Sequence, residues 1–250
     1  MDLGLKGKVA LVTGSTHGIG HAIARRLAEE GARVILNGRT ASRLDQAAVE
    51  LRAAGKFAAD TSDPKACIAM MEYVAREHGA LDVLVCNVGS GASVPPGTET
   101  REEWQRMLDI NLHSATNAVS AATPLLARSR GVVVCISSIC GLEALGAPIA
   151  YAAAKAALNS YVRGAARPLA KEGVRINAIA PGNILFPGSV WERKMKEAPE
   201  QVEAMLARDV ALGRLGSAEE VADLAAFLAS ARSGFATGAV YVLDGGQVRS

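Results

Sequence analysis

The sequence predicts an α/β fold in which a doubly wound parallel sheet of about seven strands carries helices on both faces. Two observations lead to this prediction. Short apolar runs alternate with segments of helical periodicity along the whole chain. The chain has 250 residues, 50% of them hydrophobic, which suffices for one large core. Since no linker, repeat or low-complexity tract interrupts this alternation, we expect residues 1–250 to form a single domain.

The expected strands are short apolar runs of the kind that are buried in parallel sheets. They are predicted at residues 9–13, 34–36, 57–59, 83–86, 132–136, 175–179 and 240–243. The expected helices lie between them, at residues 21–30, 41–54, 64–78, 101–128, 151–170 and 218–228. Gly31 and Gly55 are expected to end the first two helices. Pro168 is expected to kink or end the fifth helix.

Residues 183–213 are the exception to this alternation, because they are irregular and contain large apolar side chains. An insertion of this length is often a lid or a binding loop, so we expect a substrate lid near residues 183–213. The alternative is a pair of surface helices that pack on each other. Likewise, Phe186, Trp191 and Met195 either form an apolar pocket wall or attach the lid to the body.

The composition argues against several classes of function. The formal net charge is +2 and no block of like charge is present, so no nucleic-acid or membrane partner is expected. No apolar stretch approaches the roughly 18 residues of a membrane span, and we expect no signal peptide. We expect a cytoplasmic protein without a metal site, since its cysteines lack metal-ligand spacing and are expected to be reduced and mostly buried. These cysteines are Cys67, Cys86, Cys135 and Cys140.

A glycine-rich turn of sequence GSTHGIG follows the first predicted strand and precedes the first predicted helix. Glycines allow a backbone to approach a pyrophosphate, whose negative charge is favoured at a helix N-terminus. A P-loop would require Lys-Ser/Thr after the last glycine, so we predict instead a dinucleotide site on a Rossmann-like sheet. The residues expected to bind the cofactor in this turn are Gly14, Ser15, Thr16, Gly18 and Ile19.

The identity of the dinucleotide depends on the end of the second strand. An acidic residue there would accept hydrogen bonds from the ribose hydroxyls of NAD, but the sequence has Arg39 and Thr40 and no carboxylate. Arg39 would pair with a 2′-phosphate and stack on adenine, with Thr40 as a further donor. We therefore predict NADP(H) in preference to NAD(H). The alternative is that Arg39 is a solvated surface residue.

Tyr151 and Lys155 are four residues apart in a predicted helix, so they lie on one face of it. A free phenol has a pKa near 10, and a neighbouring ammonium would lower that pKa. The pair is therefore a candidate acid–base group. The alternative is that both residues are on the surface and that their spacing is coincidental.

These motifs resemble the short-chain dehydrogenase/reductase family, and the resemblance covers essentially the entire chain. The glycine turn and the Tyr151–Lys155 pair are joined by other family signatures in the family's order and spacing. These signatures are Asp60, Asn87-Val88-Gly89, Asn111, Ser138 and Pro181-Gly182. Ser138 stands thirteen residues before Tyr151, the spacing of the substrate-orienting serine in the family.

The resemblance implies an enzyme that reduces a ketone to a secondary alcohol by hydride transfer. Asn111, Ser138, Tyr151 and Lys155 would be its catalytic residues. Ser138 and Tyr151 would bond the substrate oxygen, and Tyr151 would donate a proton as general acid. Lys155 would lower the pKa of Tyr151 and, with Tyr151, contact the cofactor at the nicotinamide ribose. Asn111 would hold a water that links Lys155 to solvent.

The resemblance also implies further cofactor contacts. They come from Asp60, which would contact the adenine amine, and from Asn87, Gly89, Pro181, Gly182 and the backbone of Ile184. The chain departs from the family at two of these places. Val88 replaces an alanine and adds bulk beside the cofactor. Phe186 stands where a threonine would bond the nicotinamide carboxamide.

The substrate is left open between several classes. Resemblance to 3-oxoacyl-acyl-carrier-protein reductases favours a 3-oxoacyl thioester, for which Arg128 and Arg130 would form part of a basic patch at the pocket mouth. Glu172, however, stands where such reductases tend to carry a base. The alternatives are a dehydrogenase of a sugar, steroid or other secondary alcohol, and a non-catalytic NADP-binding sensor or scaffold. The last strand and tail resemble the family's tetramer contact, and the apolar helices also favour a homotetramer.

Overall fold

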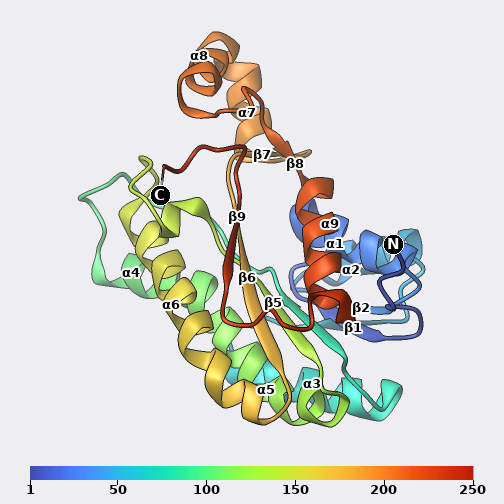
Figure 1. Ribbon diagram of the computed structural model, residues 1–250. Helices are drawn as coiled ribbons and strands as arrows, with labels where there is room; N and C mark the ends of the chain where they lie inside the picture. Colours follow the sequence, from blue (N-terminus) through green and yellow to red (C-terminus); the bar gives the residue numbers. More distant parts are fainter. Residues whose placement is uncertain (250) are drawn as a thin grey trace.

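The computed structural model describes residues 1–249 and contains one seven-stranded parallel sheet (Figure 1). The strands are β1 (Val9–Val12), β2 (Arg33–Gly38), β3 (Gly55–Ala58), β4 (Val83–Cys86), β5 (Val132–Ile136), β6 (Arg175–Pro181) and β9 (Val240–Leu243). Their spatial order is β3-β2-β1-β4-β5-β6-β9. The predicted doubly wound sheet is thus confirmed. Because the strand order reverses between β1 and β4, the carboxyl ends of these two strands are where such folds bind ligands.

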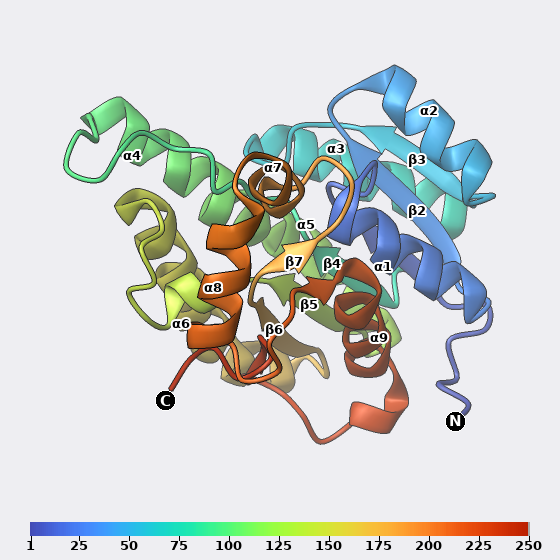
Figure 2. The same cartoon turned by 90° about the horizontal axis from the view of Figure 1, so that it is seen from above.

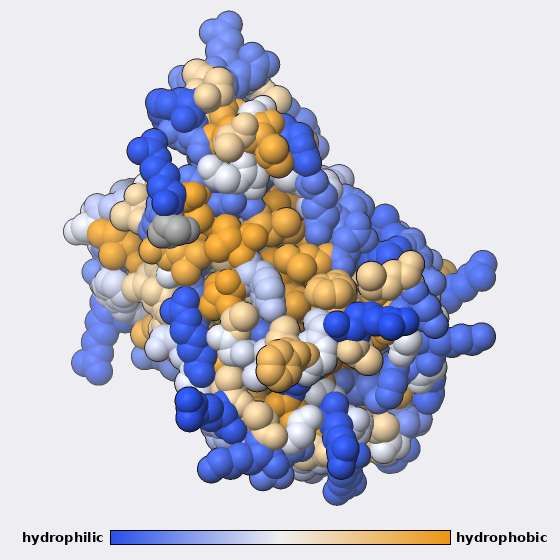
Figure 3. Space-filling view, in the orientation of Figure 1, coloured by the Kyte–Doolittle hydropathy of each residue, from blue (hydrophilic) through white to orange (hydrophobic). Residues whose placement is uncertain are grey.

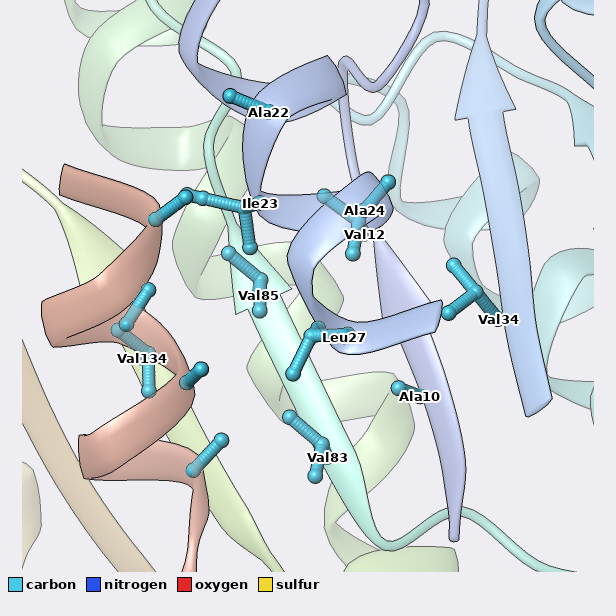
Figure 4. Close-up of a cluster of buried hydrophobic side chains, with 14 of the residues drawn as sticks. Ala10, Val12, Ala22, Ile23, Ala24, Leu27, Val34, Val83, Val85 and Val134 are labelled. Carbon is cyan, nitrogen blue, oxygen red and sulfur yellow. The ribbon is translucent and has the colours of Figure 1, made fainter. Parts of the chain in front are cut away.

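The helices cover both faces of this sheet (Figure 2). They are α1 (Gly18–Glu29), α2 (Ala41–Glu50), α3 (Pro64–His78), α4 (Arg101–Leu108), α5 (Ser114–Ser129), α6 (Ile149–Lys171), α7 (Val190–Glu197), α8 (Pro199–Asp209) and α9 (Ala218–Ala229). One core lies between the sheet and α1, α2 and α9, and a second lies between the sheet and α3, α5 and α6. Figure 4 shows Val12, Val85 and Val134 pointing into the first core. The next residues along β4 and β5 belong to the opposite core, which is why these strands are continuous apolar runs.

Capping residues determine where several helices near the carboxyl edge begin. The Thr100 hydroxyl accepts a hydrogen bond from the Glu103 N–H at the start of α4 (3.2 Å). Ser217 and Glu220 bond each other's backbone N–H groups at the start of α9. Such caps satisfy N–H groups that have no partner within the helix, so they fix where α4 and α9 begin.

The segment between β6 and α9 stands above the carboxyl edge of the sheet, at the top of Figure 1. It contains a two-stranded sheet of β7 (Ile184–Leu185) and β8 (Gly216–Ser217), together with α7 and α8. Val202 and Leu206 of α8 are buried in a small cluster against Trp191 and Met195. These two side chains therefore pack α7 and α8 on each other, as the alternative prediction held.

The predicted end of the second helix was wrong. The second helix ends at Glu50 and not at Gly55, because the chain turns at Arg52, whose φ is 47°. Gly55 instead begins β3, where a Cβ would lie 2.7 Å from His78 Nε2. Of the two alternatives predicted for Pro168, an end of the helix is contradicted, because α6 continues to Lys171 and buries Leu169. The helical stretches predicted near residues 101–128 are α4 and α5, which are separated by a π-helical turn, Asp109–His113.

The thiols follow the prediction from composition. All four cysteines are unpaired, three of them are buried, and Cys140 is half-buried. Within residues 1–249, no three His, Cys, Asp or Glu side chains are grouped so that they would hold a metal ion. No helix in that range is both long enough and apolar enough to cross a membrane.

Candidate active site

A pocket of about 1210 Å³ opens at the carboxyl edge of the sheet. Its walls come from the glycine turn, the ends of β2 and β4, one face of α4 and the start of α6. Most of the predicted site residues line it. They are Gly14, Thr16, Gly18, Ile19, Arg39, Thr40, Asp60, Asn87, Gly89, Tyr151 and Lys155. The fold thus brings residues from five different parts of the chain to one pocket.

The remaining predicted site residues surround this pocket without lining it. They are Ser15, Asn111, Ser138, Pro181, Gly182 and Ile184. Ser15 and Asn111 are completely buried. Pro181 and Gly182 form the carboxyl end of β6, where the Gly182 N–H donates to the Leu243 carbonyl (2.9 Å). Ile184 packs into the core, so the predicted contact of its backbone with the cofactor stays a prediction.

The glycine turn is shaped by backbone conformations and contacts that only glycine accepts. Gly14 and Gly18 have φ angles of 62° and 59°, in the left-handed region. A Cβ on Gly20 would collide with the side-chain amide of Asn87. That amide donates to the carbonyls of Thr13 (3.1 Å) and Gly14 (3.0 Å). Asn87 therefore holds the turn in shape from β4, and the turn presents the N-terminus of α1 to the pocket.

Asn37, at the end of β2, supports the same turn and was not predicted as a site residue. Its side-chain nitrogen donates to the carbonyls of Phe57 (3.1 Å) and Ala59 (3.2 Å), and its oxygen accepts from the Gly14 N–H (3.4 Å). Its backbone N–H donates to the Ser15 hydroxyl (3.0 Å). The Ser15 side chain thus serves the fold beneath the pocket. A buried polar residue at the end of an apolar strand was the only signal in the sequence.

One end of the pocket is exposed and charged. Arg39 Nη1 lies 3.7 Å from Asp60 Oδ2. Asp60 Oδ1 accepts hydrogen bonds from the N–H (2.9 Å) and hydroxyl (2.7 Å) of Ser62. Burial acts to raise the pKa of Asp60, but these bonds and the Arg39 charge outweigh it and hold the pKa below its usual value. Arg43, in the first turn of α2, also lines this end and was missed in the sequence.

The other end of the pocket is buried and is built around Lys155. This lysine is 3% exposed, and its Nζ donates to the Ile136 carbonyl at the end of β5 (2.9 Å). Burial lowers the pKa of Lys155 to about 8. A Cβ on Gly89 would lie 2.9 Å from that Nζ and 3.0 Å from Asn111 Oδ1. Gly89 therefore leaves the room in which the ammonium and the asparagine lie.

Tyr151 lies one turn before Lys155 on α6. Burial raises the pKa of Tyr151 to about 12, against the opposite effect of a hydrogen bond with Ser138. The expected lowering of this pKa by Lys155 is not found, because burial of the phenol dominates. Tyr151 is therefore protonated at neutral pH and can donate. The neighbouring Ser138 is 7% exposed, and its hydroxyl accepts from the Cys140 N–H (3.1 Å).

Asn111 occupies the middle of the π-helical turn between α4 and α5, a distortion that is frequent at functional sites. Its oxygen accepts from the Ser90 N–H (2.9 Å), and its nitrogen donates to the carbonyls of Ser90 (3.0 Å) and Met107 (3.1 Å). The side chain therefore fixes the loop that follows β4. The predicted water link to Lys155 stays a prediction.

Phe186 is the only one of the three predicted apolar lid residues that lines the pocket. Its ring lies over the glycine turn, 2.8 Å from where a Cβ on Gly18 would be. Its backbone is bonded in both directions to Ser189, which caps α7. The aromatic ring thus joins the start of the lid segment to the floor of the pocket.

The proposed basic patch of Arg128 and Arg130 lies elsewhere. Both residues stand at the end of α5, directly before β5. The pocket lies at the carboxyl end of β5, since Ile136 and Ser137 line it. The two arginines therefore lie at the opposite edge of the sheet, and the prediction that they border this pocket was wrong.

The residues present fit a dinucleotide that carries a 2′-phosphate. The first N–H groups of α1 have no partner within the helix and suit a pyrophosphate. Two guanidinium groups, Arg39 and Arg43, line the end of the pocket where a 2′-phosphate would require positive charge. At the other end, Tyr151 and Lys155 place a phenol and an ammonium beside the same pocket.

Known proteins resemble this chain over nearly its whole length. Residues 14–247 match the family described as enoyl-(acyl carrier protein) reductase. The chain is 38% identical over 245 residues to cis-4-hydroxycyclohexanecarboxylate dehydrogenase of Sinomonas cyclohexanicum, covering 96% of each chain. It is 33% identical over 249 residues to the 3-oxoacyl-[acyl-carrier-protein] reductase FabG of Thermotoga maritima, covering 98% of this chain and 99% of that protein.

Solved structures show the same similarity. L-sorbose reductase from Gluconobacter frateurii, crystallised with NADPH and L-sorbose, superposes with a TM-score of 0.94. The two chains are 31% identical and cover each other completely. Sequence identity and fold therefore point to the same family. The chain belongs to the short-chain dehydrogenase/reductase family of oxidoreductases.

Proposed function

We propose that this protein is an NADP(H)-dependent reductase (EC 1.1.1.-) that converts a small-molecule ketone into a secondary alcohol. The observation that carries the proposal is the placing of Tyr151 and Lys155 on one face of α6, beside Ser138 and open to the pocket. The relatives described above are named for a hydroxycyclohexane acid, a 3-oxoacyl thioester and a ketose. Their common chemistry is the interconversion of a ketone and a secondary alcohol.

Each catalytic side chain has a separate task in this proposal. Tyr151, kept protonated by its burial, donates its phenolic proton to the substrate oxygen as general acid. Ser138 donates a second hydrogen bond to that oxygen and stabilises its negative charge. Lys155 contributes an ammonium close to the phenol and holds the end of β5. When bound, the nicotinamide supplies the hydride.

Arg39 and Arg43 would hold the 2′-phosphate that distinguishes NADP(H), with Thr40 as an additional donor. Asp60 would then contact the adenine amine. The ion pair between Arg39 and Asp60 is long and exposed, so little free energy is lost when Arg39 turns toward a phosphate.

Two further features belong to the proposal. Residues 183–213 would act as a substrate lid, since Phe186 connects them to the pocket floor. The protein would assemble as a homotetramer, because Phe227, Phe235 and Val242 are exposed on α9, the loop that follows it and the edge strand β9. Figure 3 shows apolar side chains gathered over the middle of this face. Sedimentation as a monomer at micromolar concentration would count against the tetramer.

A substrate screen with NADPH and NADH in parallel tests the proposed function. The panel contains cyclic ketones, keto sugars, a keto steroid and a 3-oxoacyl thioester, and the oxidation of the reduced cofactor is followed by stopped flow. We expect turnover of at least one ketone, with NADPH preferred. Tight binding of NADPH without turnover of any carbonyl would favour the non-catalytic sensor instead.

A further inference from the structure

The turn after β5, which carries Ser138, lies on the backbone of α6. The Ser137 hydroxyl donates to the Lys155 carbonyl (3.4 Å). Gly141, at the far end of the turn, lies so close that a Cβ there would be 2.7 Å from the carbonyl carbon of Lys155 and 2.8 Å from the nitrogen of Ala156. The turn that carries Ser138 therefore packs directly on α6, the helix that also carries Tyr151 and Lys155.

Asn159 anchors the far end of this turn. It follows Lys155 by one helical turn on the same face of α6 and is 1% exposed. Its side-chain nitrogen donates to the Gly141 carbonyl (3.2 Å). Its Oδ1 is buried and, among the residues that the structure describes, finds no hydrogen-bond partner. Asn159 does not line the pocket, so it does not reach a ligand there.

The Gly141 carbonyl and the Ser138 hydroxyl belong to one short 3₁₀ turn, Ile139–Gly141. The Gly141 N–H donates to the Ser138 carbonyl (3.0 Å), and the Cys140 N–H donates to the Ser138 hydroxyl (3.1 Å). A shift of Gly141 away from α6 therefore moves both groups that orient Ser138. The Ser137 hydroxyl holds the start of the turn on α6, and the bond from Asn159 holds its Gly141 end and opposes this shift.

We infer that Asn159 is a positioning residue that holds the Ser138 hydroxyl in register with the Tyr151 phenol by fixing Gly141 against α6. This inference rests on the proposed function, in which both hydroxyls bond the substrate oxygen. Tyr151, Lys155 and Asn159 lie at successive turns on one face of α6, and each then has a different role. Tyr151 donates the proton, Lys155 supplies charge and holds the strand end, and Asn159 holds the serine turn. A displacement of about 1 Å at a catalytic group can cost up to about 100-fold in rate.

The test is a double-mutant cycle with Asn159→Ala in the wild-type and Ser138→Ala backgrounds, measured as single-turnover oxidation of enzyme-bound NADPH with a ketone identified in the screen. We expect Asn159→Ala to slow wild-type turnover about 10-fold and to leave the Kd for NADPH unchanged. In the Ser138→Ala background it should have almost no further effect, because there is no serine hydroxyl left to misplace. Asn177→Ala is the matched control, since Asn177 is also buried and donates to a backbone carbonyl, that of Ala236, away from the pocket.

Equal slowing by Asn159→Ala in both backgrounds would overturn the inference, as would wild-type turnover by the single variant. If Ser138→Ala itself leaves turnover unchanged, the proposed function has failed instead. Should Asn159→Ala not fold, Asn159→Asp keeps the shape of the side chain. An ionised aspartate cannot donate to Gly141 and a protonated one can. Turnover of Asn159→Asp relative to wild type should therefore rise as pH falls, and a ratio independent of pH would contradict the inference.

Discussion

The two ends of the pocket are built in opposite ways. At the catalytic end, Lys155 is 3% exposed and bonded to the end of β5, and Ser138 lies in a turn that is packed on α6. At the exposed end lined by Arg39, Asp60 and Arg43, which we call the adenosine end, the side chain of Arg39 is 73% exposed. Its Nη1 lies 3.7 Å from Asp60 Oδ2. Under the proposed function, buried contacts would fix the catalytic groups, while exposed charges would select the cofactor. Substitutions among the buried catalytic residues should therefore abolish turnover, whereas substitutions among the exposed charged residues should only alter cofactor affinity.

The largest expected effect is at the catalytic end. Tyr151→Phe removes the proton donor and leaves the ring in place, so turnover should fall about 1000-fold. The Kd for NADPH, measured by the quenching of protein fluorescence, should stay close to that of the wild type. Retained turnover would show that Tyr151 is not the general acid, and the two ends of the pocket would then not differ as described.

A smaller effect is expected from Arg39→Glu at the adenosine end. Loss of a charge-assisted bond to the 2′-phosphate should raise the Kd for NADPH about 30-fold. The Kd for NADH should change little or fall, since a carboxylate there accepts bonds from the ribose hydroxyls. Turnover at saturating cofactor serves as the control and should be preserved. An unchanged Michaelis constant for NADPH would refute the NADP(H) assignment.

The pH dependence of kcat/KM for NADPH tests the role of the buried Lys155. Burial lowers the pKa of Lys155 to about 8, so its positive charge is present below pH 8 and is lost as the pH rises through that value. We therefore expect kcat/KM for NADPH, which reports the free enzyme, to fall about 10-fold for each pH unit above 8. Tyr151, with its pKa raised to about 12, stays protonated throughout. A flat profile up to pH 9.5 would contradict this role of Lys155.

The smallest effect is expected from Arg43→Ala. Its guanidinium lines the exposed end of the pocket, where a solvated ion pair contributes only about 0.2–1 kcal/mol. The Kd for NADPH should therefore rise about 3-fold, and the increase should shrink at high salt. A loss as large as that of Arg39→Glu would show that Arg43, and not Arg39, is the principal phosphate ligand.

The sequence predicted those parts of the fold and site that depend on local patterns. Apolar runs located the strands. The glycine turn, Tyr151 and Lys155, all singled out by their spacing, line one pocket, and their catalytic and binding roles stay predictions. Asn37 and Asn159 escaped because their partners lie 18 to 23 residues away in the chain. The only local signal was the position of Asn37 at the end of an apolar strand, and Asn159 had none.

Two predictions that depended on the three-dimensional surroundings of a side chain were wrong. The pKa of Tyr151 is raised and not lowered, because the sequence shows a neighbouring charge but not how completely the phenol is enclosed. Arg128 and Arg130 were assigned to the pocket mouth, but the parallel sheet places the loop before β5 at the other edge. How deeply a side chain is buried, and at which edge of the sheet it lies, could be established only from the folded structure.

The close packing at Gly89, against side-chain ends, and at Gly141, against the backbone of α6, has a consequence for the evolution of this chain. A methyl group at Gly141 would lie 2.7 Å from the backbone of α6, so saturation mutagenesis there should recover glycine alone. A methyl group at Gly89 would meet the ends of the Lys155 and Asn111 side chains, so a replacement there should displace these groups. Arg39 and Arg43 lie in open solvent-facing positions and should tolerate many replacements that alter selectivity while sparing folding. New cofactor preferences can therefore arise by one or two surface exchanges, whereas a new reaction would require rebuilding the interior around α6.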